Sequence, residues 1–242
     1  MIEIRKLSKR FGEKEVLKNI DLVVEKGERI AIIGGSGCGK STLLRLILGL
    51  QRPDNGRVLV DEKDVHRISY EALRKLRLKF GTLFQSSALF DSMTVAENVG
   101  FSLVENLRLP AGQVSDIVKD KLEWVAMSGY ENQMPSQLSG GQRKRVGLAR
   151  ALAADPEIML YDEPTTGLDP ITSTHIEDLI VKLTQTRRVT SVVVSHQIST
   201  ILRTADKIYM MYEGQLLPPE SPATIANSAD PRIREFIRGG LS

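Results

Sequence analysis

Eight consecutive residues in the N-terminal part of the sequence have the types and spacing of a phosphate-binding loop. Residues 34–41 read Gly-Gly-Ser-Gly-Cys-Gly-Lys-Ser, that is, a glycine, four residues and then Gly-Lys-Ser. In this pattern the glycines let backbone N–H groups approach phosphate oxygens, Lys40 reaches the β- and γ-phosphates, and the Ser41 hydroxyl coordinates Mg²⁺. The residues predicted to hold the nucleotide here are Gly34, Gly35, Ser36, Gly37, Cys38, Gly39, Lys40, Ser41 and Thr42.

Two carboxylates, Asp162 and Glu163, directly follow an apolar run at 158–161 that reads as a buried strand. Ligands of open α/β sheets bind at the C-terminal ends of such strands. Asp162 can hold Mg²⁺ through water, and Glu163 can polarise the attacking water as a general base. A phosphate loop alone is shared by kinases, GTPases and ATPases, and an Asp-Glu pair alone is often a helix N-cap. Together they predict nucleoside triphosphate hydrolysis.

A third motif, Leu-Ser-Gly-Gly-Gln at 138–142, precedes a predicted helix with Val146, Ala149 and Ala153 facing inward. A serine hydroxyl, a glycine amide and a helix N-terminus together can form a second anion site. At this motif the sequence resembles the ATP-binding-cassette (ABC) family, whose signature reads LSGGQ. The resemblance implies that the signature of one subunit contacts the γ-phosphate held by the phosphate loop of a second copy. The residues involved would be Ser139, Gly140, Gly141 and Gln142.

Further residues match family motifs in order, and the resemblance covers the chain to about residue 216. Phe11 and Val16 stand where the family places the shelf under the adenine ring. Gln85 matches the glutamine that touches Mg²⁺ and the water, Asp169 the loop that crosses the dimer seam, and His196 the switch histidine that holds the γ-phosphate. The resemblance therefore implies Glu163, His196 and Gln85 as catalytic residues, Ser41, Gln85 and Asp162 as Mg²⁺ ligands, and ATP as the nucleotide.

The elements that must position these residues follow an alternating pattern of strands and helices. Period-two alternation at Ile2 and Ile4, and again at Ile20, Leu22 and Val24, predicts an antiparallel opening. Further strands are then expected at 29–33, 58–60, 81–85, 158–161, 191–194 and 208–212, with helices at 42–50 and 70–79 and a turn at 53–56. This order is typical of an α/β fold with a mostly parallel sheet covered on both faces. The family implies a RecA-like P-loop NTPase sheet.

Residues 86–154 are predicted to be a helical insertion with a small core of its own. Apolar residues recur there at helical spacing along one face, namely Val114, Ile117, Val118, Leu122 and Val125. We expect one ABC ATPase domain over 1–242, with an ATP-binding core at 1–85 and 155–217, this helical signature subdomain at 86–154, and a tail at 218–242 that ends in a short helix.

Composition limits the partners and the compartment. The 242 residues include one cysteine, 33 Lys and Arg and 30 Asp and Glu, for a formal charge of +3. One cysteine and a charged opening segment indicate a reducing, cytosol-like compartment, and the apolar run at 43–50 is too short to span a bilayer. The small, mixed charge predicts no nucleic-acid partner. The basic clusters at 74–77 and 143–145 are predicted to be solvated helix faces, with anionic headgroups near the first as the alternative.

Local phrases at 83–95, 169–172 and 230–236 resemble the ATPases of Mla and Mce-type lipid transporters, and 194–197 resembles their cyanobacterial and chloroplast members. This resemblance implies a membrane permease, an Mce-type lipid-binding protein and a second copy of the chain as partners. It implies a cytoplasmic location, peripheral on the inner or plasma membrane, or on the stromal face in a plastid. The alternatives are an ABC ATPase for amino acid or metal import, and a non-transport ABC ATPase.

A surface for the permease is expected next to the catalytic glutamine. It would comprise Gln85, Ser87, Leu89, Phe90 and Met93, because these residues adjoin the water-activating site and include apolar side chains. The competing interpretation places Phe84 and Phe90 in the core.

Overall fold

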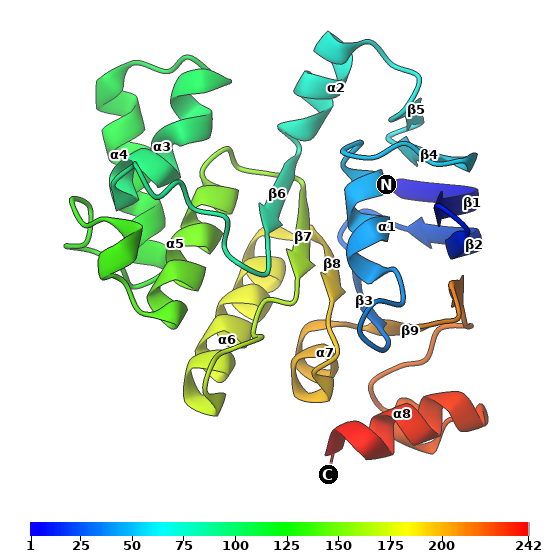
Figure 1. The fold of residues 1–242 in the computed structure, drawn as a ribbon. Helices are drawn as coiled ribbons and strands as arrows, with labels where there is room; N and C mark the ends of the chain where they lie inside the picture. Colours follow the sequence, from blue (N-terminus) through cyan, green and yellow to red (C-terminus); the bar gives the residue numbers. More distant parts are fainter. Residues whose placement is uncertain (242) are drawn as a thin grey trace.

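In the computed structural model, which describes residues 1–241, five parallel strands and one antiparallel edge strand form the central sheet (Figure 1). The strand order is β10-β9-β3-β8-β7-β6. The predicted mostly parallel sheet is therefore confirmed. Its strands are β3 (Arg29–Ile33), β6 (Phe80–Leu83), β7 (Ile158–Asp162), β8 (Thr190–Val194), β9 (Lys207–Tyr212) and β10 (Gln215–Leu216).

A second sheet is antiparallel, as the alternation at the start of the sequence predicted. It has the order β2-β1-β4-β5, from β1 (Ile2–Phe11), β2 (Lys14–Val24), β4 (Asn55–Val60) and β5 (Lys63–Asp64). The turn predicted at 53–56 is wrong in its second half, since β4 already begins at Asn55. Gly56 permits this early start: its φ is +80°, and a Cβ there would lie 2.3 Å from the Lys6 carbonyl oxygen.

The central sheet is buried on both faces, and neighbouring residues of one strand belong to different cores. Ile30 and Ile32 of β3 join the cluster made by α1 (Lys40–Ile47) and the antiparallel sheet. Ala31 and Ile33 join the cluster on the opposite face, which includes side chains of α5, α6 and α7. The loop that follows β3 is thus anchored by a strand with apolar packing on two sides.

The helical segment comprises α3 (Val95–Glu105), α4 (Ala111–Trp124), η1 (Pro135–Gln137) and α5 (Gly140–Leu152), beside β6 in Figure 1. The predicted apolar face of α4 is confirmed, with Val118 and Leu122 buried. The expectation of a separate small core is wrong, because these side chains form one continuous cluster with a face of the central sheet. The close approach of α5 explains this continuity: a Cβ on Gly147 would lie 3.0 Å from Leu83 Cδ1.

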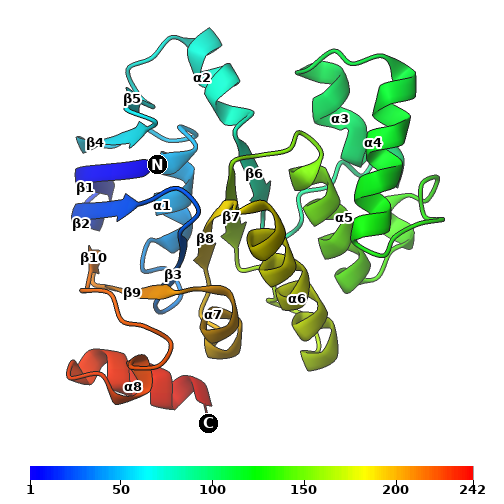
Figure 2. The ribbon, with the colours of Figure 1, turned by 180° about the vertical axis from the view of Figure 1, so that it is seen from behind.

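The remaining helices are α2 (Tyr70–Arg77), α6 (Pro170–Arg187), α7 (Ile198–Thr204), η2 (Ile225–Asn227) and α8 (Pro231–Leu241), the last lying beyond β9 and α7 (Figure 2). The predicted short closing helix is α8, whose Ile233 and Ile237 are buried. The solvated face predicted at 74–77 is wrong for Arg77, which donates to the carbonyls of Leu48 and Gly49 at the end of α1. Within residues 1–241, no helix has the length and apolarity of a membrane span.

Candidate active site

The phosphate-type loop connects β3 to α1 and has a shape that two of its glycines make possible. Gly34 has φ +152°, and a Cβ there would lie 2.5 Å from the Met211 carbonyl oxygen. Gly39 precedes α1 with φ +113°, and its Cβ would lie 2.8 Å from Leu17 Cδ2. A side chain at either position would displace β9 or β2 from the loop. The glycines therefore hold the loop close to the two sheets, with the start of α1 directed at the site.

A cavity of about 1050 Å³ lies over this loop, a volume suited to a small-molecule ligand. It brings together predicted residues that are far apart in sequence. Phe11 is 47% exposed, and Lys9 Nζ lies over its ring, 5.5 Å from the ring centroid. The predicted site residues that line it are Phe11, Val16, Gly35, Ser36, Gly37, Gly39, Lys40, Ser41, Thr42, Gln85, Glu163 and His196.

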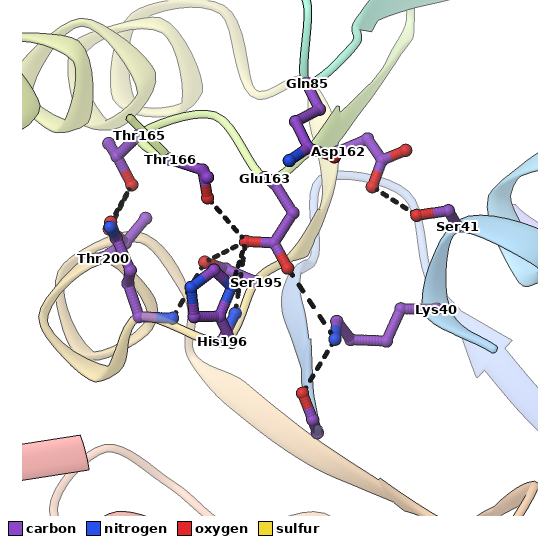
Figure 3. A network of polar contacts seen from close by, with 12 residues as sticks. Lys40, Ser41, Gln85, Asp162, Glu163, Thr165, Thr166, Ser195, His196 and Thr200 are labelled. Carbon is purple, nitrogen blue, oxygen red and sulfur yellow. Dashed lines mark hydrogen bonds and ion pairs between the residues drawn. The ribbon is translucent and has the colours of Figure 1, made fainter. Parts of the chain in front are cut away.

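Lys40 lies nearly buried at the floor of the cavity (Figure 3). Its Nζ donates hydrogen bonds to the carbonyl oxygens of Gly34 at 2.7 Å and Gly35 at 3.1 Å, and lies 3.7 Å from Glu163 Oε1. The ammonium group is thus placed between the loop and the acid at the end of β7. An anionic group bound over the loop would meet this charge together with the amides at the start of α1.

Glu163 has a strained backbone, and several polar contacts hold its carboxylate. Its φ of +49° lies in the left-handed region, which is unusual for a residue with a side chain. Its Oε2 lies 2.9 Å from His196 Nδ1 and accepts hydrogen bonds from the hydroxyls of Ser195 and Thr166. Burial raises the pKa of Glu163, but the contacts from His196 and Ser195 outweigh it and hold the pKa below its usual value. The carboxylate is therefore ionised at neutral pH and able to accept a proton.

Ser41 and Asp162 form the part of the site with the chemistry of a magnesium centre. The Ser41 hydroxyl donates to Asp162 Oδ1 at 2.8 Å, and both residues line a second cavity together with Gln85. Burial raises the pKa of Asp162, and the negative charge of the neighbouring Glu163 raises it further. The hydrogen bond from Ser41 lowers the pKa but does not cancel the rise. Hydroxyl, amide and carboxylate oxygens fit Mg²⁺, which keeps several waters and takes other ligands from phosphates. Among residues 1–241, no group of three or more His, Cys, Asp or Glu is arranged to hold a metal ion.

Cys38 is not among the residues that line the cavity, although its Sγ lies 4.0 Å from Lys40 Nζ. Its half-buried side chain packs against the core on the α1 face of the sheet, and a Cβ on Gly34 would lie 2.8 Å from its Sγ. Burial raises the pKa of this thiol. The side chain therefore supports the loop from behind.

Alkylation of Cys38 is expected to abolish nucleotide binding, because an added group has no room behind the loop and must displace it. Because the pKa is raised, reaction with N-ethylmaleimide should be slower than that of free cysteine and should accelerate from about pH 7 to about pH 9. Mass spectrometry of the labelled chain and a fluorescent-nucleotide titration measure both effects. Cys38→Ser is the matched control, which should bind nucleotide after the same treatment. Full binding by fully labelled protein would contradict the prediction.

The signature residues lie outside the cavity, at the start of α5. Ser139 is the N-cap of this helix. Its hydroxyl accepts a hydrogen bond from the backbone N–H of Gln142 at 3.3 Å, and Gln142 Oε1 accepts one from the backbone N–H of Ser139 at 2.8 Å. Gln142 Nε2 also donates to the Tyr130 hydroxyl. Packing explains why the second signature position is a glycine, since a Cβ on Gly141 would lie 2.4 Å from Thr172 Cγ2 of α6.

Asp169 also acts locally in this chain, as the N-cap of α6. Its side chain accepts from the Thr172 amide at 3.0 Å. As far as the structure describes the chain, the cavity over the phosphate loop is lined neither by Asp169 nor by the signature residues Ser139, Gly140, Gly141 and Gln142. One chain therefore holds two groups of predicted site residues in separate places.

Two sets of residues near the site were missed by the sequence analysis. Lys144 was predicted to be solvated with its neighbours, which is wrong: it is 4% exposed, and burial lowers its pKa to about 8. The available signal was its helical spacing of four and eight residues from Leu148 and Leu152, which are also buried. The second set belongs to α8, which contributes Arg232, Glu235 and Phe236 to the cavity wall. Nothing in the periodicity of the tail indicated that placement.

The surface predicted for a permease is only partly exposed. Ser87 is 2% exposed and cannot contribute to a docking surface. Phe90 is 42% exposed and packs against Phe101, with ring centroids 4.7 Å apart and ring planes tilted by 46°. Phe84 packs against the core, so the core interpretation holds for Phe84 and not for Phe90.

A protein-family model described as ABC transporter matches residues 17–166, which include the phosphate loop, the signature and the strand-end carboxylates. The chain belongs to the ABC transporter family. Its activity is that of an ABC ATPase, and its nucleotide is ATP. The cassette fold predicted from the sequence is thereby confirmed.

Individual relatives match nearly the whole chain. The chloroplastic protein TRIGALACTOSYLDIACYLGLYCEROL 3 of Arabidopsis thaliana is 42% identical, over 100% of this chain and 74% of that protein. The intermembrane phospholipid transport system ATP-binding protein MlaF of Haemophilus influenzae is 39% identical, over 99% of this chain and 90% of its own length. A solved dimeric ATP-binding cassette in a post-hydrolysis state, bound to ADP and Pi, superposes with a TM-score of 0.85 at 33% identity, over 92% of this chain and 99% of that one.

Proposed function

We propose that this ABC ATPase is the motor subunit of a transporter that moves phospholipid or a related lipid between membranes. The observation that carries the proposal is the match, over 99% of this chain, to a protein named as the ATP-binding protein of an intermembrane phospholipid transport system. The 42% identity to the chloroplast relative supports the same branch of the family.

Within the proposed site, the phosphate loop and Lys40 hold the triphosphate, and Phe11 with Val16 supports the base. Ser41, Asp162 and Gln85 would hold Mg²⁺, which when bound would neutralise charge on the phosphate oxygens. Glu163 accepts a proton from the water that attacks the γ-phosphorus, the bond from that phosphorus to the β,γ-bridging oxygen breaks, and ADP takes the released electron pair. His196 orients the Glu163 carboxylate through its 2.9 Å contact and, as a residue of the same cavity wall, would meet the γ-phosphate.

Two copies would pair head to tail, so that residues 139–142 and Asp169 of one copy complete the site of the other. The separation of these residues from the cavity of their own chain supports this arrangement. Moving a two-state transporter from mostly open to mostly closed needs about 5.5 kcal/mol of differential binding, which two γ-phosphates gripped by both subunits could supply. We assign the ATP-binding core to 1–85 and 155–217, the helical subdomain to 86–154 and the tail to 218–242.

The partners in this proposal are a membrane permease, which would dock beside Gln85, Leu89, Phe90 and Met93, and an Mce-type lipid-binding protein. The exposure of Phe90 supports the first contact. The chain would then lie peripherally on the cytoplasmic face of the membrane, or on the stromal face in a plastid.

A pull-down of the tagged chain from detergent-solubilised membranes, with protein and lipid identified by mass spectrometry, tests the proposal. We expect an integral-membrane subunit, an Mce-type protein and enriched phospholipid in the same complex. A permease recovered without lipid enrichment, or with an amino acid or metal-binding subunit, would favour another cargo. If the chain is present in the membranes but is recovered without any membrane subunit, the result would support a non-transport ATPase.

A further inference from the structure

Lys144 contacts the backbone of two residues of the catalytic site from the signature helix α5. Its Nζ donates hydrogen bonds to the carbonyl oxygen of Gln85 at 2.6 Å and to that of Glu163 at 3.2 Å. These carbonyls belong to the segments that follow β6 and β7. One buried ammonium group therefore joins α5 to the ends of two neighbouring strands.

The backbone that Lys144 holds at Glu163 is the strained one. A left-handed φ of +49° at a residue with a Cβ persists only when surrounding contacts fix it. The Glu163 carbonyl accepts from Lys144 Nζ and, at 3.4 Å, from the Thr166 amide. The hydrogen bond from Lys144 is the shorter of the two, and it comes from a charged donor, which strengthens it. The direction of the Glu163 side chain depends on this peptide.

The segment after Gln85 is held by α5 a second time. Arg150, nearly two turns after Lys144, donates to the carbonyl oxygens of Ser87 at 2.8 Å and Ala88 at 2.6 Å. Gly147 lies between the two cations in sequence, and a Cβ there would lie 3.1 Å from Ser87 Cβ. The segment thus follows α5 closely, and Lys144 is the residue that extends this attachment to Glu163.

We propose that Lys144 is a positioning residue for ATP hydrolysis, which fixes the backbones of Glu163 and Gln85 to the signature helix. Movement of α5 then changes the position of the water-activating carboxylate. This inference rests on the proposed roles of Glu163 and Gln85. It assigns no contact between Lys144 and the nucleotide. Replacing Lys144 should therefore change the rate of hydrolysis and leave the affinity for the nucleotide almost unchanged.

The test compares Lys144→Met, Lys144→Gln and Lys144→Arg with the unsubstituted chain in the intact complex. Methionine is of similar length and has no donor, so we expect kcat to fall about 10- to 100-fold while the Kd for ATP changes less than about 3-fold. Lys144→Arg keeps a charged donor and should recover part of kcat. Arg145→Met is the matched control: it removes the next cation of the same helix, whose contact is His175, and should leave kcat unchanged.

A double-substitution cycle distinguishes positioning from general damage. In a Glu163→Gln background, Lys144→Met should add little further loss, because the residue that it positions has already lost its function. Losses that multiply would overturn the proposal, as would an unchanged kcat or a loss confined to ATP affinity. If Lys144→Met fails to fold, the same cycle with Lys144→Gln decides. Failure of the proposed role of Glu163 is a different result, since Glu163→Gln alone would then hydrolyse ATP at the normal rate.

Discussion

Replacing Glu163 with glutamine is expected to lower the rate of ATP hydrolysis by about 10²- to 10⁴-fold while ATP still binds. The amide keeps the shape of the side chain and can still accept from the hydroxyls of Ser195 and Thr166, which now hold the carboxylate. It cannot take the proton of the attacking water. The phosphate loop and Asp162 are unchanged, so the contacts to the triphosphate remain.

The variant should therefore accumulate as an ATP-bound closed dimer, which size-exclusion chromatography with Mg-ATP and the permease would detect. Glu157→Gln is a suitable control, because Glu157 precedes the same strand, pairs with Lys79 at its far end and lies away from the cavity. Its ATPase rate should stay unchanged. If Glu163→Gln stays monomeric with Mg-ATP and its permease, the proposed pairing of two copies is wrong.

Replacing Lys40 with alanine should weaken ATP binding on the order of 10²-fold or more, because the charged donor at the floor of the cavity is lost. The change also removes the hydrogen bonds from Nζ to the carbonyls of Gly34 and Gly35, and it leaves Glu163 without the ammonium group at 3.7 Å. Both changes leave negative charge next to the bound triphosphate without the neutralising ammonium group, so both weaken its binding. Titration with a fluorescent ATP analogue measures the loss.

Lys119→Ala on α4 is the control for Lys40→Ala, because it removes an exposed lysine far from the loop and should bind ATP normally. Circular dichroism should show that the Lys40→Ala chain is folded. An unchanged Kd for ATP in a folded variant would contradict the role assigned to Lys40.

Much of the fold could be predicted from the sequence, because its signals are local. The apolar runs of β3, β7 and β8 show burial on two faces directly, and the loop motif fixes the order of strand, loop and helix around Lys40. The predicted residues that line the cavity came from the family motifs, most of which lie at the end of a strand or the start of a helix.

The parts that could not be predicted depend on contacts between distant segments. Lys144 and Ser87 are polar, so composition indicated exposure, but α5 and the segment after β6 bury each other. The role of α8 in the cavity wall depends on how the tail folds back along β9. The need for a second glycine in the signature depends on Thr172, 31 positions further along the chain.

That contact between Gly141 and Thr172 limits how the motifs can move. With a Cβ position only 2.4 Å from the Thr172 methyl group, the first turn of α5 and the first turn of α6 leave no space between them. Asp169 caps that same turn of α6. In mechanical terms, this contact is a stop: α5 cannot tilt toward α6 without displacing Thr172. We therefore expect the signature and the Asp169 N-cap to keep their spacing when either helix is pushed toward the other.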